Sequence, residues 1–234
     1  MEILSAQFLS ALVAIVIIDL ALAGDNAIVI ALAARALPRD LQRKAIIWGT
    51  VGAIAVRVVM TMAVVWLLGI PGLMLAGGLV LVWIAYRLLK PADEGGHEIK
   101  QAAGFWGAMQ TIVIADAAMG LDNVLAVAGA AHGSFLLVVL GLIISIPIVI
   151  WGSTLVLRLL ERFPWIIQIG VAVLAWTAAK MMISEPLVKD FFAAQPIYEY
   201  AVYVAVFAIV FGAGYLATRK HAAAGERSKL AEQA

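Results

Sequence analysis

The chain has 234 residues, of which 65% are hydrophobic and 13% are charged, and its mean hydropathy is +1.04. A soluble domain of this length cannot bury so much apolar surface. The net charge of +1 argues against a nucleic-acid partner, and the absence of cysteine excludes disulfides and thiolate metal sites. Because apolar runs of about 20 residues fold as helices in lipid, an all-α polytopic membrane protein is predicted.

Seven apolar stretches predict seven transmembrane helices, and Gly, Pro or charged residues mark most of the joins. The expected ranges are 6–34, 45–69, 72–90, 104–131, 135–157, 165–184 and 197–218. We expect a single transmembrane domain over residues 1–218. Residues 219–234 are polar, and we expect them to form a disordered cytoplasmic tail.

Lys and Arg gather in the first, third and fifth connecting segments and in the tail. Thirteen of the 16 basic residues lie there, namely Arg35, Arg39, Arg43, Lys44, Arg87, Lys90, Lys100, Arg158, Arg162, Arg219, Lys220, Arg227 and Lys229. Short loops rich in these residues stay in the cytoplasm. The distribution therefore predicts an inner (plasma) membrane protein with its N-terminus outside and its C-terminus in the cytoplasm.

The pattern D-x5-D-N occurs twice, each time inside a long apolar run. The first copy contains Asp19, Asp25 and Asn26, and the second copy, 97 residues later, consists of Asp116, Asp122 and Asn123. An aspartate at the centre of a spanning helix costs about 2.5–3.5 kcal/mol on insertion scales. Four of them therefore indicate a functional site rather than packing.

The repeat extends beyond this motif. Pro71, Trp83 and Arg87 are matched at a spacing of 93 residues by Pro164, Trp176 and Lys180. Each copy holds three spans, an odd number, so the second copy (about 104–186) is expected to be inverted relative to the first (about 6–91). Inverted repeats are a transporter architecture with the binding site near the bilayer midplane. The seventh helix, 197–218, lies outside the duplication.

On a straight helix, the side chain of Asp25 points about 100° away from the face that Asp19 and Asn26 share. A kink or an unwound turn at Gly24 and at Gly120 would bring such groups together, since glycine bends at the lowest cost. If the inverted copies cross there, four carboxylates and two amide oxygens face one centre.

Carboxylate and amide oxygens suit a hard divalent cation, Mn²⁺, Mg²⁺ or Ca²⁺, and six ligands match octahedral coordination. Four carboxylates carry more charge than one divalent ion neutralises. We therefore expect some of them to be protonated when the ion is absent, and exchange of the ion for protons is a hypothesis. No catalytic residue is predicted, so the chain is not expected to be an enzyme.

Arg57 lies deep within the second predicted span, too far from its ends to reach water easily. Two roles are open. It is either a gating or charge partner that pairs with a motif carboxylate when the ion is absent, or one member of a fixed structural ion pair.

The segments DLALAGDNAIVIALAAR and DAAMGLDNVLAVAGAAHG resemble the two signatures of the TerC family of integral membrane proteins, in particular its short YjbE-like members, within the wider LysE exporter superfamily. The resemblance covers about residues 6–218. It implies a seven-helix protein associated with metal-ion efflux, chiefly of manganese, and it points to the two Asp-Asp-Asn sets as ion ligands. Many relatives carry Ser where this chain has Gly120, so a hydroxyl ligand at that position is not carried over from the resemblance.

Three other functions remain open at this point: an exporter of a small cationic organic solute, an intramembrane aspartyl protease, and a membrane protein that hands metal to other proteins. Export from the cytoplasm rests on the resemblance alone, because an ion site and an inverted repeat do not set a direction. The divalent ion and the lipid bilayer are the expected partners, and the sequence identifies no protein partner.

Overall fold

The computed structural model describes residues 5–67, 70–89, 99–131 and 134–232. Regular secondary structure within these ranges is helical, which follows from the need to bond backbone groups internally in lipid. The helices are α1 (Ala6–Ala34), α2 (Arg39–Met62), α3 (Val64–Leu67), α4 (Leu73–Leu89), α5 (Ile99–Ala130), α6 (Phe135–Arg162), α7 (Ile166–Ile183), α8 (Lys189–Ala194) and α9 (Pro196–Glu232).

Four of the described helices are long and apolar enough to cross a membrane: α2, α6, α7 and the part of α9 from residue 196 to residue 216. The two segments of α1, joined at a bend of 49°, make a fifth if together they form one span. The prediction of an all-α polytopic membrane protein is confirmed. The count of seven spans stays a prediction, because neither α4, which has 17 residues, nor α5 is among these candidate spans.

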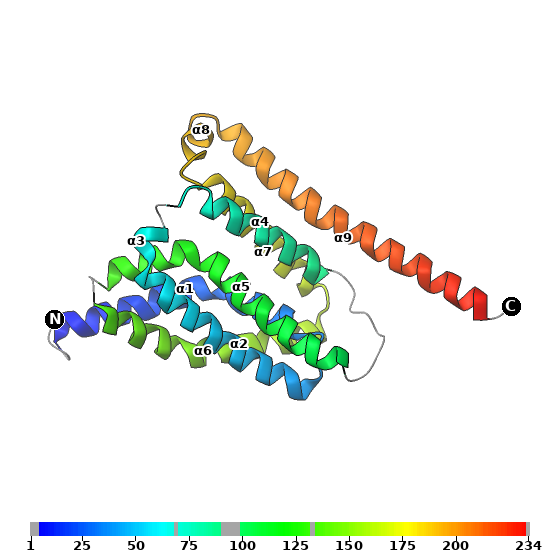
Figure 1. The fold of residues 1–234 in the computed structure, drawn as a ribbon, viewed down its shortest axis with the longest axis horizontal. Coiled ribbons are helices and arrows are strands. Elements are labelled where there is room, and N and C mark those ends of the chain that lie inside the picture. The colour runs from blue at the N-terminus through cyan, green and yellow to red at the C-terminus, as the bar shows by residue number, and fades with distance from the viewer. Residues whose placement is uncertain (1–4, 68–69, 90–98, 132–133, 233–234) are drawn as a thin grey trace.

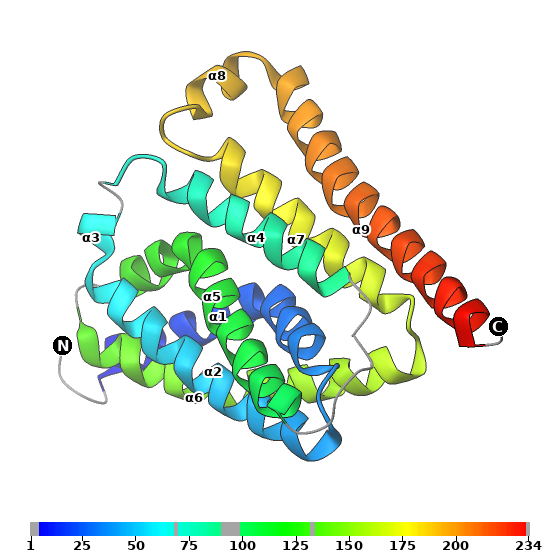
Figure 2. The same ribbon diagram turned by 45° about the vertical axis from the view of Figure 1, so that its right-hand side comes forward.

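The helices form a bundle with a lateral layer (Figures 1 and 2). α1, α2, α5 and α6 lie together, α4 and α7 run side by side next to them, and α9 packs on α4 and α7 along the outside. The most extensive contacts join α1 to α6, α2 to α5 and α4 to α7. Helices from the first half of the chain therefore pack mainly on helices from the second half.

The buried apolar side chains form two main clusters, one on each side of the bend of α1. One cluster packs the first half of α1 against α2, α5 and α6, and the other packs its second half against α4, α5 and α7. The bend lies between the segments 6–20 and 24–34, so it separates Asp19 from Asn26. A break near Gly24 was expected. α5, in contrast, is one continuous helix through Gly120.

Glycine allows the closest helix contacts. A Cβ atom added at Gly141 would lie 2.4 Å from Ile15 Cγ2, and one added at Gly78 would lie 2.8 Å from the carbonyl oxygen of Ala178. Small residues at crossings are the usual way for helices to approach closely in membranes. These contacts join α1 to α6 and α4 to α7.

The C-terminal part of α9 continues as helix to Glu232, into the segment that was expected to be a disordered tail. Side chains from residue 217 on lie outside what the structure describes. The division into one transmembrane domain and a tail stays a prediction.

Candidate ion-binding site

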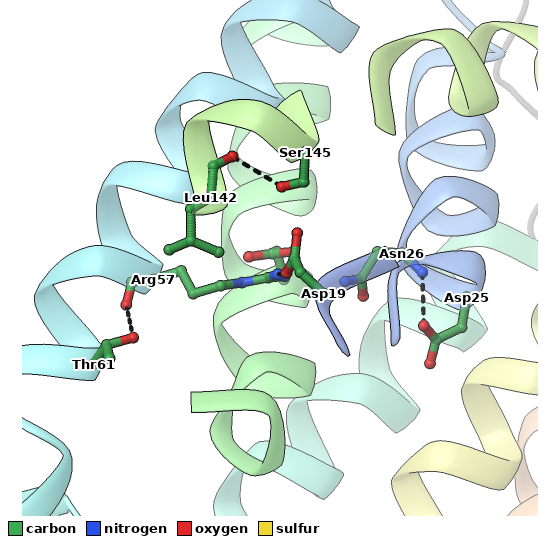
Figure 3. Close-up of polar contacts among 8 residues, drawn as sticks. Asp19, Asp25, Asn26, Arg57, Thr61, Leu142 and Ser145 are labelled. Carbon is green, nitrogen blue, oxygen red and sulfur yellow. Dashed lines mark hydrogen bonds and ion pairs between the residues drawn. The ribbon is translucent and has the colours of Figure 1, made fainter. Parts of the chain in front are cut away.

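Arg57 is the centre of a buried polar cluster in the four-helix bundle. Its side chain is 4% exposed and lies on the buried face of α2, with Ile54 and Thr61 one turn away on either side. Its guanidinium donates from Nη1 to Asp19 Oδ1 on α1 and from Nη2 to Asp116 Oδ1 on α5. Figure 3 shows the Arg57 side chain extended toward Asp19. One guanidinium thus bridges the first aspartates of the two motif copies.

The cluster holds three charges away from water. Asp19 is 1% exposed and Asp116 is 7% exposed, so Arg57 and the two carboxylates sum to a charge of −1. Buried charges persist only when they are paired and hydrogen-bonded. The pairing is incomplete, because Asp116 Oδ2 and Arg57 Nε are buried without a hydrogen-bond partner among the described residues.

Asn26 contributes a third unpaired atom. Its side chain is 3% exposed and is directed toward the cluster across the bend of α1 (Figure 3). Within the part of the chain that the structure describes, Asn26 Oδ1 has no hydrogen-bond partner. A buried amide oxygen without a donor is costly in an apolar interior. It is also the kind of atom that a cation would bind.

Asp25 lies apart from the cluster. Its side chain is half-buried, and its Oδ1 accepts a hydrogen bond of 2.9 Å from the backbone N–H of Asn26. Figure 3 shows Asp25 turned away from Asp19 and Arg57. The local bond to the backbone holds this carboxylate on the other face of the helix, as expected for neighbouring residues.

On α5, the second motif copy is described in part. Asn123 is 7% exposed, while the side chain of Asp122 lies outside what the structure describes. Asp19 and Asp116 are therefore brought to one guanidinium, and Asn26 and Asn123 are buried, whereas Asp25 does not join them. Among the described residues, no group of three or more His, Asp or Glu side chains is close enough to hold a metal. Arg57 lies between the two carboxylates that would begin such a group.

Two residues of α6 were not singled out from the sequence, and one of them, Ser145, lies near this cluster. Ser145 is fully buried and its hydroxyl donates to the carbonyl oxygen of Leu142 at 2.9 Å, in the neighbourhood that Figure 3 shows around Asp19. Pro147 follows within the same helix and removes one backbone hydrogen bond there. A serine and a proline inside an apolar run are the signals that could have identified them.

Glu185 is another buried acid that the sequence did not indicate. It lies beyond the end of α7, is 1% exposed, and accepts from the backbone N–H groups of Gly72 at 2.8 Å, Met74 at 3.1 Å and Leu75 at 3.3 Å. Burial alone would raise the pKa of its carboxyl, but these hydrogen bonds hold the pKa below its ordinary value. Glu185 thus caps the start of α4 and does not belong to the ion site.

Comparisons with known proteins bear on the whole chain. Residues 4–222 match the family model described as "Integral membrane protein TerC family". The chain is 47% identical over 187 residues to "Uncharacterized membrane protein YjbE" of Bacillus subtilis, a match that covers 80% of this chain and 85% of YjbE. No solved structure matches.

More distant relatives match a smaller share of the chain. "Uncharacterized membrane protein YkoY" of Bacillus subtilis is 27% identical over 68% of this chain and 55% of its own length. "UPF0053 inner membrane protein YgdQ" of Escherichia coli K12 is 23% identical over 70% of this chain and 76% of its own length.

The family match and the apolar helices agree with each other. Together they identify a multi-pass membrane protein, in keeping with a membrane transporter. Since the family model covers nearly all of the sequence, and YjbE is closely similar over most of both chains, this chain belongs to the TerC family of integral membrane proteins.

Proposed function

We propose that this chain is a secondary transporter that exports a divalent metal ion from the cytoplasm, and that this ion is Mn²⁺. The observation that carries the proposal is the cluster at Arg57. Equivalent carboxylates of two motif copies meet at one cation, and the acceptor oxygens Asn26 Oδ1 and Asp116 Oδ2 are buried without a donor among the described residues. Oxygen ligands of this kind suit a hard divalent ion.

Arg57 acts in this proposal as an internal cation that the transported ion replaces. The guanidinium neutralises one of the two buried carboxylates that it contacts, and a divalent ion would neutralise both. Loss of the ion without return of Arg57 would leave two buried carboxylates unpaired, which is strongly unfavourable. The return of Arg57 to its position between Asp19 and Asp116 would therefore stabilise the empty site.

The full ligand set is proposed to comprise Asp19, Asp25, Asn26, Asp116, Asp122 and Asn123. Asp25 faces away in the Arg57-bound arrangement. Its entry into the coordination shell requires a rotation of the turn that follows the α1 bend. That rotation would link ion binding to the shape of α1, which is what alternating access needs.

We propose an architecture of seven spans, with two inverted repeats of three and an extra seventh helix. The reciprocal packing of α1 on α6 and of α2 on α5 supports it, because a pseudo-two-fold axis would relate these two contacts. Asp19 and Asp116 belong to opposite repeats, so a rocking of one repeat against the other would change the distance between them.

Orientation, cargo and direction are supported by different observations. The concentration of basic residues at one end of the bundle supports an inner-membrane location with the N-terminus outside and the C-terminus inside. Manganese and efflux come from the family resemblance, and Mg²⁺ or Ca²⁺ would fit the same ligand chemistry. Exchange for protons, and the absence of enzyme activity, stay predictions.

A manganese-load experiment tests this function in cells. Cells that express the wild-type chain should hold less manganese than cells without it, and Asp19→Asn and Asp116→Asn should each abolish the difference. Asp190→Asn removes an exposed acid from α8 and serves as the matched control, which should export normally. Equal manganese content with the wild-type chain and with both site variants would refute the proposal, provided that all variants reach the membrane in equal amounts.

A further inference from the structure

A polar cavity of about 320 Å³ lies among three arginine side chains, and none of its lining residues belongs to the two motifs. It is formed where α2 begins and α6 ends, two helices that pack on each other. Its charged lining consists of Arg39, Arg43, Arg158 and Glu161. The volume falls within the range of roughly 300–1,000 Å³ that is usual for small-ligand pockets.

The cavity carries an excess of positive charge. Three guanidinium groups and one carboxylate line it, a sum of +2. Arg39 pairs with Glu161 at 3.8 Å, and since their side chains are 89% and 45% exposed, this pair is weak. Among the ion pairs of the described residues, none involves Arg43 or Arg158. Two guanidiniums are thus free to bind an anion.

The uncharged polar side chains of the cavity are already engaged. The Gln42 amide nitrogen donates to the carbonyl oxygen of Arg35 at 3.3 Å, and the Thr154 hydroxyl donates to that of Ile150 at 2.7 Å. The arginines therefore decide which ligand is held. The planar guanidinium groups match the oxygens of a phosphate. The same groups would repel a divalent cation, so the transported ion is not expected to bind in this cavity.

The surroundings of the cavity point to a lipid rather than a soluble anion. Leu155 lies one helical turn before Arg158, on the same side of α6, and is 42% exposed. Large apolar side chains that remain exposed in a membrane protein face acyl chains or the interface. A phospholipid could thus place its phosphate on the arginines and its chains along α6.

We propose that this cavity binds the phosphate of an anionic phospholipid from the leaflet on the basic, cytoplasmic side of the membrane. Basic pockets between transmembrane helices are suited to such headgroups. A bound lipid would hold the start of α2 against the end of α6. The site is independent of the ion site, since it shares no residue with the six proposed ligands or with Arg57.

The test measures lipid affinity and thermal stability on the purified full chain in detergent. Phosphatidylglycerol, phosphatidylcholine with the same acyl chains, and inorganic phosphate are titrated separately. Phosphatidylglycerol should bind tightest and raise the melting temperature most. Arg43→Gln and Arg158→Gln should each weaken its binding about fivefold, the effect expected for one basic residue near an anionic lipid.

Two matched variants make the result specific. Lys44→Gln combined with Arg162→Gln removes the same charge as Arg43→Gln combined with Arg158→Gln. It spares the cavity lining and should leave the lipid affinity close to that of the wild-type chain. Glu161→Gln frees Arg39 and should tighten binding, an effect that a folding defect cannot imitate.

Several outcomes would overturn the lipid site. Equal affinity for phosphatidylcholine would exclude headgroup recognition, and equal stabilisation by inorganic phosphate would indicate a soluble anion. An equal loss in the Lys44/Arg162 variant would indicate diffuse surface charge. Looser binding in Glu161→Gln would contradict the role given to the guanidiniums.

Discussion

Asp19 and Asp116 occupy equivalent positions in the two motif copies, and both accept a hydrogen bond from the same guanidinium, that of Arg57. The repeat thus supplies the acids twice, while α2 supplies the cation once. Residues at the spacing of the second repeat that would match Arg57 are uncharged, Ile150 among them. This asymmetry leaves the cluster one positive charge short of neutrality, a shortfall that a divalent ion in place of Arg57 would remove.

Replacing Arg57 by Met tests its role as an internal cation. The variant should be less stable without metal by about 3–5 kcal/mol, because two buried carboxylates lose their partner. It should bind Mn²⁺ more tightly than the wild-type chain, since no guanidinium competes. Thermal unfolding with and without Mn²⁺ measures both effects, and Arg39→Met, which removes an exposed arginine, is the control. A metal-induced shift no larger than that of the wild-type chain would show that Arg57 is only structural.

Replacing Gly120 by Ser should add a hydrogen bond to the Arg57 side chain. A Cβ atom at this position would lie 3.7 Å from Arg57 Nε, an ordinary contact, and Nε is buried without a partner among the described residues. A serine hydroxyl there can accept the Nε–H hydrogen bond, which is worth about 1.5–3 kcal/mol when one partner is charged. The variant should be more stable and should need more Mn²⁺ for half-maximal transport than Gly120→Ala, which adds the same Cβ atom without the hydroxyl. A Ser variant that behaves like the Ala variant would argue against this geometry.

Replacing Glu185 by Gln tests the cap of α4. Loss of the carboxylate should cost about 1 kcal/mol, as for other helix N-caps. The pKa of Glu185 is held below its ordinary value, so its stabilisation is fully present above the unfolded-state pKa. It is lost as the pH falls through the lower folded-state pKa. Melting curves between neutral and acidic pH should therefore converge for the wild-type chain and the Gln variant, while exposed Asp190→Asn should track the wild-type chain throughout.

The contact between α4 and α7 gives a matched pair of glycine substitutions. Gly78→Ala places a Cβ atom 2.8 Å from the Ala178 carbonyl oxygen, a backbone atom that cannot move alone, and should cost about 1–3 kcal/mol. Gly129→Ala on α5 has nothing within 4 Å and should be neutral or stabilising, because alanine favours helix. Unfolding in detergent compares the two. Equal melting temperatures would mean that α4 and α7 do not pack as described.

The positions of the helices followed from the sequence because apolar runs in lipid have little choice but helix. The breaks within the predicted spans and the short helix in a connection did not follow from the sequence. α2 ends at Met62 and α3 follows after Ala63, within a single predicted span, and the short helix α8 lies in a connection for which no helix was predicted. Such details depend on local hydrogen bonds that hydropathy does not register.

Some residues of the candidate site could be identified from the sequence, and others could not. The acids stood out as costly charges in apolar runs, and Arg57 stood out for the same reason. The outward turn of Asp25 depends on a single bond to the backbone of Asn26, which spacing alone does not reveal. Glu185 was missed because the N–H groups that it binds lie more than 100 residues earlier in the chain.

Ion flux in proteoliposomes tests the central claim most directly. The purified full chain is reconstituted with a Mn²⁺-sensitive dye inside, external Mn²⁺ is added, and the rate is compared among the wild-type chain, Asp19→Asn, Asp116→Asn and Asp190→Asn. The account predicts saturable Mn²⁺ entry for the wild-type chain and Asp190→Asn, and loss of entry in both site variants. Undiminished flux in Asp19→Asn and Asp116→Asn, or no flux in correctly folded wild-type protein, would contradict it.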